Sequence, residues 1–122
     1  MQIRIVCPWP PGALTPNAKR RLHWSRYSPV AKRYRIACWT LAREALGLAR
    51  FAAPPSVKIE FHPPDARHRD DDNMVGAFKA GRDGIAEAIA FDDRHWRPAY
   101  TFHPPHRPAG QVVVTIEGEA KV

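Results

Sequence analysis

The stretch that decides the fold runs from Arg69 to Asp93 and reads RDDDNMVGAFKAGRDGIAEAIAFDD. It opens with three aspartates and an asparagine and closes with Asp92 and Asp93. Between these ends, apolar residues recur at helical spacing from Met74 to Ile89, which predicts a helix. The two ends hold five of the twelve acidic residues of a chain whose net charge is +7. Because grouped carboxylates need a cation to hold them together, the pattern favours a divalent metal beside a polyanion.

The two acidic ends have to come together if they form one site. Asp70 and Asp72 are two residues apart, and in an extended segment such side chains point to the same side, so both can bind one hard cation. A continuous helix over residues 73–90 would span roughly 26 Å and keep the far aspartates away. We therefore expect either a break near Gly81–Gly84 or a carboxylate supplied by a second subunit.

A structural explanation of the same residues stays open. Asp72 or Asn73 is a suitable N-cap for the helix, and acidic residues are favoured at a helix N-terminus. Asp83 lies four residues after Lys79, where the two would form a surface ion pair of little energetic value. The glycines of the segment either weaken the helix or allow another backbone to come close.

Outward from this segment, the chain alternates between strand and helix patterns. Ser28-Pro29 predicts the start of the first long helix, because serine is a good N-cap and proline suits the first turn, and Gly47 predicts its end. The order β–α–β–α–β–β predicts one α+β domain over residues 1–122, with a mixed sheet of about four strands covered by two main helices. The predicted strands are 2–7, 57–62, 96–103 and 111–117, and the predicted helices are 28–47 and 73–90.

The segment before the first long helix is strongly basic. Residues 13–27 read ALTPNAKRRLHWSRY and predict a long loop. Basic residues interleaved with His23, Trp24 and Tyr27 suit contact with phosphates and exposed bases, although a merely solvated loop is the alternative. Trp9, which stands between prolines, is expected to pack at one end of the core rather than to stack on a base.

Composition excludes several classes of protein. Nineteen lysines and arginines against twelve acids indicate a polyanionic partner such as nucleic acid. No apolar run approaches the ~20 residues of a membrane helix, and the N-terminus lacks the succession typical of a secretory signal. We therefore expect a cytoplasmic protein without a membrane partner or a small-molecule cofactor.

The cysteines and histidines show no metal-binding spacing. Cys7 and Cys38 are expected to be buried thiols in a reducing compartment rather than a disulfide or a metal pair. The histidines are scattered, without the paired spacing of a zinc site, so solvated or locally bonded side chains are expected. The scattered histidines are His62, His68, His95, His103 and His106.

Asp70-x-Asp72-Asn73, followed about twenty residues later by Asp92-Asp93, resembles the RusA Holliday-junction resolvases of bacteria and their prophages. The N-terminal strand followed by PWPP at residues 8–11, and the basic stretch after it, resemble that family too. The resemblance covers nearly the whole chain. It implies a RusA-like fold and a homodimeric, Mg²⁺-dependent endonuclease that resolves four-way DNA junctions by paired symmetric nicks, in DNA recombination and repair.

The resemblance also implies roles for particular residues. Asp70, Asp72 and Asp93 would hold Mg²⁺, with Asp92 as an alternative to Asp93. Lys79 would be the catalytic lysine, although in some members that lysine stands three residues after the asparagine, where this chain has a glycine. The residues expected to hold backbone phosphates are Lys19, Arg20, Arg21, Arg26, Lys32, Arg33, Arg67 and Arg69.

Two other functions remain open from the sequence. A non-catalytic DNA-binding module would use the aspartates only as caps and ion-pair partners. A small Mg²⁺-dependent phosphohydrolase acting on nucleotides would also need grouped carboxylates, but a small substrate needs fewer cations than this chain carries.

Overall fold

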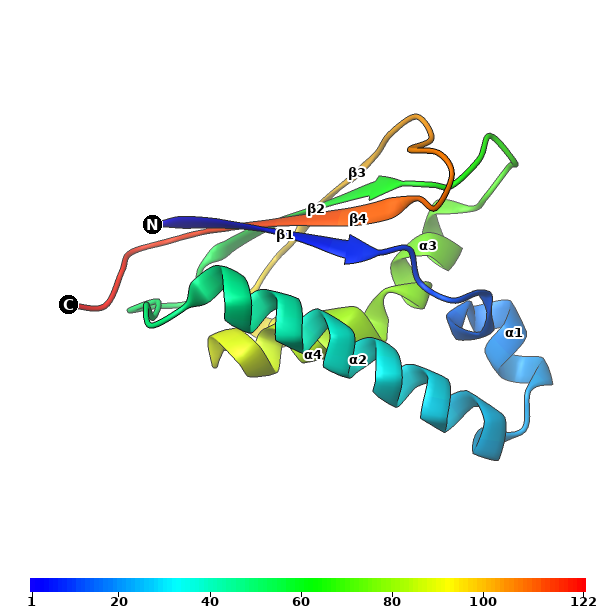
Figure 1. Ribbon diagram of the computed structural model, residues 1–122, viewed down its shortest axis with the longest axis horizontal. Coiled ribbons are helices and arrows are strands. Elements are labelled where there is room, and N and C mark those ends of the chain that lie inside the picture. The colour runs from blue at the N-terminus through cyan, green and yellow to red at the C-terminus, as the bar shows by residue number, and fades with distance from the viewer.

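A four-stranded mixed sheet forms one layer of the protein, whose computed structural model describes all residues from Met1 to Val122 (Figure 1). The strands lie in the order β1-β4-β2-β3, and β4 runs antiparallel to both of its neighbours. The edge strand β3 pairs parallel to β2. The strands are β1 (Gln2–Pro8), β2 (Ser56–His62), β3 (Ala99–Phe102) and β4 (Gln111–Glu117). The α+β class and the mixed four-stranded sheet are thus confirmed, although β3 is shorter than predicted.

Helices cover one face of this sheet (Figure 1). The long helix α2 packs along α4 and against β1. The helices are α1 (Pro16–Arg21), α2 (Trp24–Leu46), α3 (Asp71–Ala77) and α4 (Lys79–Ile89), with 3₁₀ turns η1 (Gly12–Leu14) and η2 (Asp93–His95). None of these helices combines the length and the apolar character that crossing a bilayer requires.

The predicted basic loop at residues 13–27 is wrong, because most of it is helical. Thr15 caps α1, since its Oγ1 accepts a hydrogen bond from the backbone N–H of Ala18 at 3.2 Å. His23 caps α2 in the same way, because its Nδ1 accepts from the N–H of Ser25 at 3.1 Å. Pro29 therefore lies inside α2 rather than at its first turn.

The predicted helix over residues 73–90 is two helices. The break falls at Phe78 (φ −86°, ψ 0°) and not near the later glycines. Those glycines instead allow close approach: a Cβ at Gly84 would run into the backbone carbonyl oxygen of Arg35 on α2, and one at Gly81 would meet the rings of Phe78 and Tyr34. The sheet and the closely packed helices α2 and α4 together enclose the core.

An aromatic cluster fills the core between the sheet and the helices. Phe61 of β2 is fully buried and packs edge-on against Phe78, with ring centroids 6.1 Å apart. Trp9 packs edge-on against Phe61 at 6.2 Å, which confirms its expected packing role. Cys7 and Cys38 are both buried free thiols, as expected. The neighbouring thiol of Cys38, together with burial, raises the pKa of Cys7.

Candidate functional site

The acidic cluster lies at the N-terminus of α3, where the chain enters the helix from an extended loop. Asp70 holds the N-cap position (φ −73°, ψ 137°), and Asp71 and Asp72 lie in the first turn. The expectation that Asp72 or Asn73 caps the helix is therefore wrong. The Asp70 side chain makes no capping hydrogen bond and is 69% exposed. Its Oδ1 lies 3.3 Å from Nε2 of the exposed His68, so the carboxylate has one close partner and remains accessible to a cation.

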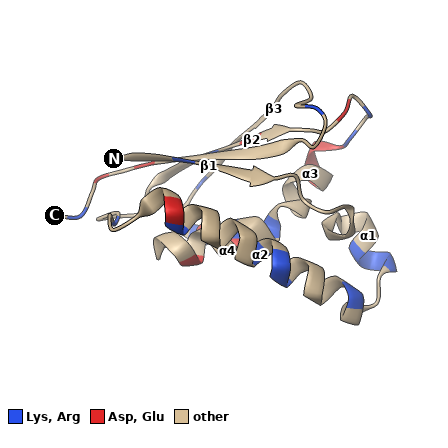
Figure 2. Ribbon diagram, in the orientation of Figure 1, with Lys and Arg blue, Asp and Glu red and all other residues tan.

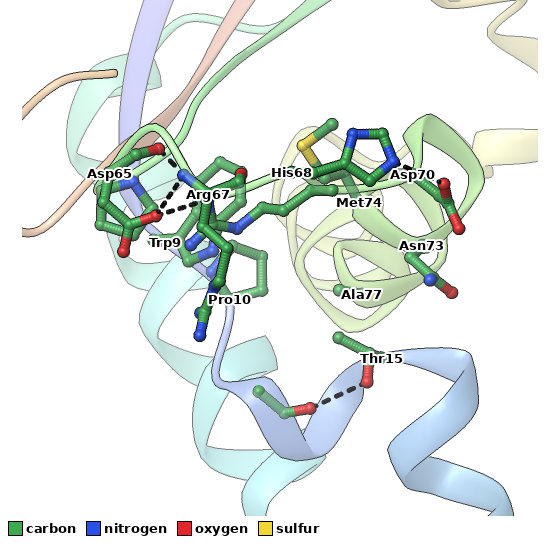
Figure 3. Close-up of a pocket in the computed structure, with 13 residues that line it drawn as sticks. Trp9, Pro10, Thr15, Asp65, Arg67, His68, Asp70, Asn73, Met74 and Ala77 are labelled. Atoms are coloured by element: carbon green, nitrogen blue, oxygen red, sulfur yellow. Dashed lines mark hydrogen bonds and ion pairs between the residues drawn. The ribbon is translucent and has the colours of Figure 1, made fainter.

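Two hollows meet at this end of α3. One is lined by the three consecutive aspartates together with Asn17, His68 and Asn73. The other, of about 400 Å³, extends from Asp70 and Asn73 to Trp9 (Figure 3). Asp72 lies in the helix rather than in an extended segment, so Asp70 and Asp72 do not share a side in the way expected for a strand. Both aspartates nevertheless line the first hollow.

The loop that leads into the cluster is fixed by Arg69. Its side chain is 14% exposed and donates to Asp65 Oδ1 at 2.9 Å and to the carbonyl oxygen of Arg67 at 3.0 Å. Its guanidinium also lies 5.8 Å from the ring centroid of Trp9. The bond from Arg69, helped by the backbone N–H of Arg67, lowers the pKa of Asp65. Arg69 therefore orders the loop that leads into the acidic cluster, and it makes these hydrogen bonds through Nη1 alone.

The far aspartate folds back along α4. Asp93 Oδ2 lies 3.4 Å from Lys79 Nζ and 3.4 Å from the guanidinium of Arg82. Lys79 also donates to Asp83 Oδ1 at 2.6 Å. The hydrogen bond that Lys79 donates to Asp83 raises the pKa of Lys79, and the charges of Asp83 and Asp93 raise it further, against an opposing effect of burial. Lys79 is therefore a cation at neutral pH.

Asp92 and Asp93 have different environments. Asp92 Oδ1 accepts a hydrogen bond from the N–H of Arg94 at 3.0 Å and so caps η2. This bond lowers the pKa of Asp92. Asp93, whose side chain is only 18% exposed, faces the cations of α4. Of the two, Asp93 is thus the aspartate that lies with Lys79.

The structure places the expected site residues in two groups rather than one. Asp70 and Asp72 share the hollow at α3, and Asp93 and Lys79 share an ion-pair network at α4. Asp70, Asp72 and Asp93 do not bring three ligand atoms within 4.8 Å of one another. Two carboxylates are still enough for Mg²⁺, which is usually bound by one or two carboxylates with waters and substrate phosphates.

Basic residues gather on α1 and on the neighbouring part of α2 (Figure 2). Three of the expected phosphate contacts, Lys19, Arg20 and Arg21, form the last turn of α1. A separate hollow is lined by Lys19 and Lys32 together with Arg35 and Lys79. This hollow links the basic helical surface to the ion-pair network around Asp93.

Fold and site together define a small α+β domain with an acidic helix end beside a basic helical surface. No family model matches the chain. An uncharacterized protein of Xylella fastidiosa (strain Temecula1) is 40% identical over 118 residues, which cover 93% of this chain and 75% of that protein. The chain belongs to the same family as this protein.

One cluster was missed by reasoning from the sequence. Glu60, His62 and His103 place their ligand atoms within 4.8 Å of one another. Burial lowers the pKa of His62, and the charge of the neighbouring His103 lowers it further. The signal in the sequence is that both histidines come at the ends of predicted strands, but only parallel pairing of these strands in one register brings them together.

Proposed function

We propose that this chain is a divalent-metal-dependent endodeoxyribonuclease that acts on branched DNA such as the four-way junction, as the resemblance to the RusA resolvases implies. The observation that carries the proposal is the exposed carboxylate of Asp70. It is not used as a cap, its close partner is the exposed His68 at 3.3 Å, and it shares a hollow with Asp72. A basic helical surface lies beside this acidic group, as a polyanionic substrate requires.

Asp70 and Asp72 are the residues that would hold Mg²⁺. Both present oxygen ligands, and the N-terminal end of α3 keeps them at one hollow. When bound, the ion would lower the pKa of a water and stabilise charge on the scissile phosphate. Asp93 would become a third ligand only if its pairs with Lys79 and Arg82 open, because these cations now occupy its carboxylate.

Lys79 would stabilise negative charge on the phosphate. Its raised pKa keeps it protonated, so it acts as a cation and not as a general base. Asp83 and Asp93 hold its ammonium group in place. Lys79 also lines the basic hollow with Lys19, which offers a continuous path for a DNA backbone from α1 to α4.

The N-terminal part of α2 would contact unpaired bases at the junction. Trp24 is 75% exposed at the start of this helix. An exposed indole stacks on bases without sequence preference, at about 1–3 kcal/mol per base. Arg26 and Lys32 on the same helix would bind phosphates, so that the shape of the junction rather than its sequence is recognised.

A homodimer would supply two equivalent sites to a two-fold symmetric junction. The paired symmetric nicks of the proposal require this arrangement, because a single chain has one Asp70–Asp72 pair. Mass determination of the full chain, alone and with junction DNA, tests the dimer separately from the chemistry.

The decisive experiment is cleavage of a synthetic four-way junction by the wild type and by Asp70→Asn. We expect cleavage with Mg²⁺, none in EDTA, and a loss of at least about 10³-fold in Asp70→Asn, since the metal supplies most of the catalysis. Glu44→Gln is the matched control, because it removes the same charge from an exposed position on α2. Junction binding without cleavage under any divalent ion would refute the nuclease proposal.

A non-catalytic DNA-binding module is the second candidate. It is favoured by the separation of Asp93 from the Asp70–Asp72 pair. In that case Asp70→Asn would leave junction binding unchanged or strengthen it, because the substitution only removes a negative charge near the DNA. The wild type and Asp70→Asn would then both bind the junction, and neither would cut it.

A further inference from the structure

A cluster of two imidazoles and a carboxylate lies on the sheet away from the acidic end of α3. β2 and β3 are parallel neighbours in which Glu60 pairs with Thr101, so the chain beyond β3 brings His103 beside His62. Residues two apart on a strand share a face, which places Glu60 and His62 together. Alternate residues Val57, Ile59 and Phe61 are buried in the core. The cluster therefore faces away from the helices, on the open side of the sheet.

The spacing within this cluster suits a single metal ion. His103 Nε2 lies 3.5 Å from Glu60 Oε1, and the ligand atoms of all three residues lie within 4.8 Å of one another. Two ligands of a tetrahedral zinc ion, with bonds of about 2.0–2.1 Å, stand roughly 3.3 Å apart. The two imidazole rings are nearly parallel, at an interplanar angle of 18° and a centroid distance of 4.5 Å. Because a ring nitrogen donates its lone pair in the plane of the ring, the two imidazoles must rotate out of this stack to bind one ion.

We propose that Glu60, His62 and His103 bind one divalent transition-metal ion of the zinc class. Two imidazoles and one carboxylate form a donor set that suits zinc and related ions, whereas Mg²⁺ prefers oxygen ligands alone. All three side chains are partly exposed, so water completes the coordination. The site is separate from the aspartates of α3 and does not depend on the nuclease proposal.

A backbone hydrogen bond and a neighbouring hydroxyl hold His103 in place before any metal arrives. The N–H of His103 donates to the carbonyl oxygen of Phe61 at 2.9 Å, which continues the pairing of β2 with β3. Thr101 Oγ1 lies 2.7 Å from His103 Nε2 and orients the ring. Since that nitrogen has a single lone pair, the threonine hydroxyl and the metal compete for it when the nitrogen is unprotonated.

The metal would join the short edge strand to its neighbour. β3 has four residues and pairs with β2 alone, so it is the least supported strand of the sheet. An ion bound by two residues of β2 and by His103, which directly follows β3, stabilises the folded state by mass action, because the unfolded chain does not present the site. The expected effect is a rise in melting temperature that depends on Zn²⁺ concentration.

Calorimetric titration of the full chain with Zn²⁺ tests the proposal, supported by absorption spectra with Co²⁺. We expect one ion bound at this site and an affinity loss of at least about 100-fold in His62→Ala and in His103→Ala, because even outer-shell changes cost 10–100-fold. Asp70→Asn should retain the site, as should His95→Ala, a matched histidine substitution on η2. Melting curves in EDTA establish that each variant is folded.

The outcomes are distinct. Zn²⁺ binding that survives both His62→Ala and His103→Ala, or that is lost in Asp70→Asn, would overturn the proposal and place the ion at α3. Thr101→Val gives a second test, because it removes the competing hydroxyl and should leave Zn²⁺ affinity unchanged or raise it. A large loss of affinity in Thr101→Val would contradict the assignment of His103 Nε2. Junction cleavage is measured in parallel, so failure of either proposal is recognised independently.

Discussion

Neighbouring aspartates in this protein differ in what their carboxylates already bind. Asp92 is used as the cap of η2, whereas Asp70 holds a cap position without making the capping bond. Asp93 forms ion pairs with Lys79 and Arg82. The sequence places five aspartates at two helix ends, but these contacts decide which carboxylates stay accessible: Asp70 is 69% exposed, with only the exposed His68 Nε2 3.3 Å from its Oδ1.

Substituting each aspartate of the terminal pair separates their roles. Asp93→Asn should lower junction cleavage by about 10²-fold, because it weakens the network that positions Lys79. Asp92→Asn should change cleavage less than about threefold, since asparagine is an equally good cap. Steady-state cleavage rates with Mg²⁺ measure both. Equal losses in the two variants would contradict the distinction drawn from the structure.

Lys79 gives a prediction about pH. Its raised pKa means that its interactions stabilise the fold fully below the unfolded-state value near 10.5 and are lost as pH rises through the folded-state pKa. The side chain is 59% exposed, so solvent screens this contribution to stability.

Lys79→Ala should lower cleavage by about 10–10²-fold without changing the shape of the pH–rate profile between about pH 6 and 9. Lys79→Arg should retain part of the rate, because it keeps the charge. A profile that loses an ionisation in Lys79→Ala would make Lys79 a general base.

At the scale of elements, the close approach of α4 to α2 depends on small residues. Gly84 faces the backbone carbonyl of Arg35 with no room for a Cβ. This contact holds α4 in the layer that covers the sheet, and α4 carries Lys79. The position of Lys79, a proposed catalytic residue, thus depends on the packing of its helix α4 against α2.

Gly84→Ala should destabilise the protein by about 1–3 kcal/mol, as overpacking of a tight contact does. The expected loss is net of the gain of up to about 1 kcal/mol that alanine brings to a helix interior. Gly12→Ala is the control, because nothing lies within 4 Å of a Cβ there. Urea unfolding of both variants gives the free energies. A Gly84→Ala protein as stable as the wild type would show that the helices separate at little cost.

Element boundaries were predictable where one local pattern dominated. The run of β-branched residues within Gln111–Glu117 predicted β4 correctly, and Gly47 ends α2 with φ +61° as its position indicated. The start of α2 was misplaced because Ser28-Pro29 matches the start of a helix, while the cap in use is His23. Histidine is a less typical N-cap than serine, and Pro29 lies inside α2, more than one turn after the helix begins at Trp24.

At the scale of the whole molecule, contacts distant in sequence determine the sites. His62 and His103 are 41 positions apart and meet because β2 and β3 are parallel and in register. Asp93 returns to Lys79 because the chain turns after α4. Neither arrangement follows from local spacing, since parallel pairing and the path of a turn depend on the assembled core.

The distribution of charge over the molecule carries the last prediction. The basic surface lies on α1 and the adjacent part of α2, around a hollow that includes Lys19 and Lys32 (Figure 2). Junction affinity should fall steeply with salt, because each neutralised phosphate releases counterions. Lys19→Ala and Lys32→Ala should each weaken binding and reduce the slope of log affinity against log salt by about one. Lys121→Ala is the matched control, because this exposed lysine lies near the C-terminus. Fluorescence anisotropy in EDTA measures binding without cleavage. If Lys121→Ala reduces the slope as much as Lys19→Ala does, DNA binds without regard to this surface, and α1 has no special part in recognition.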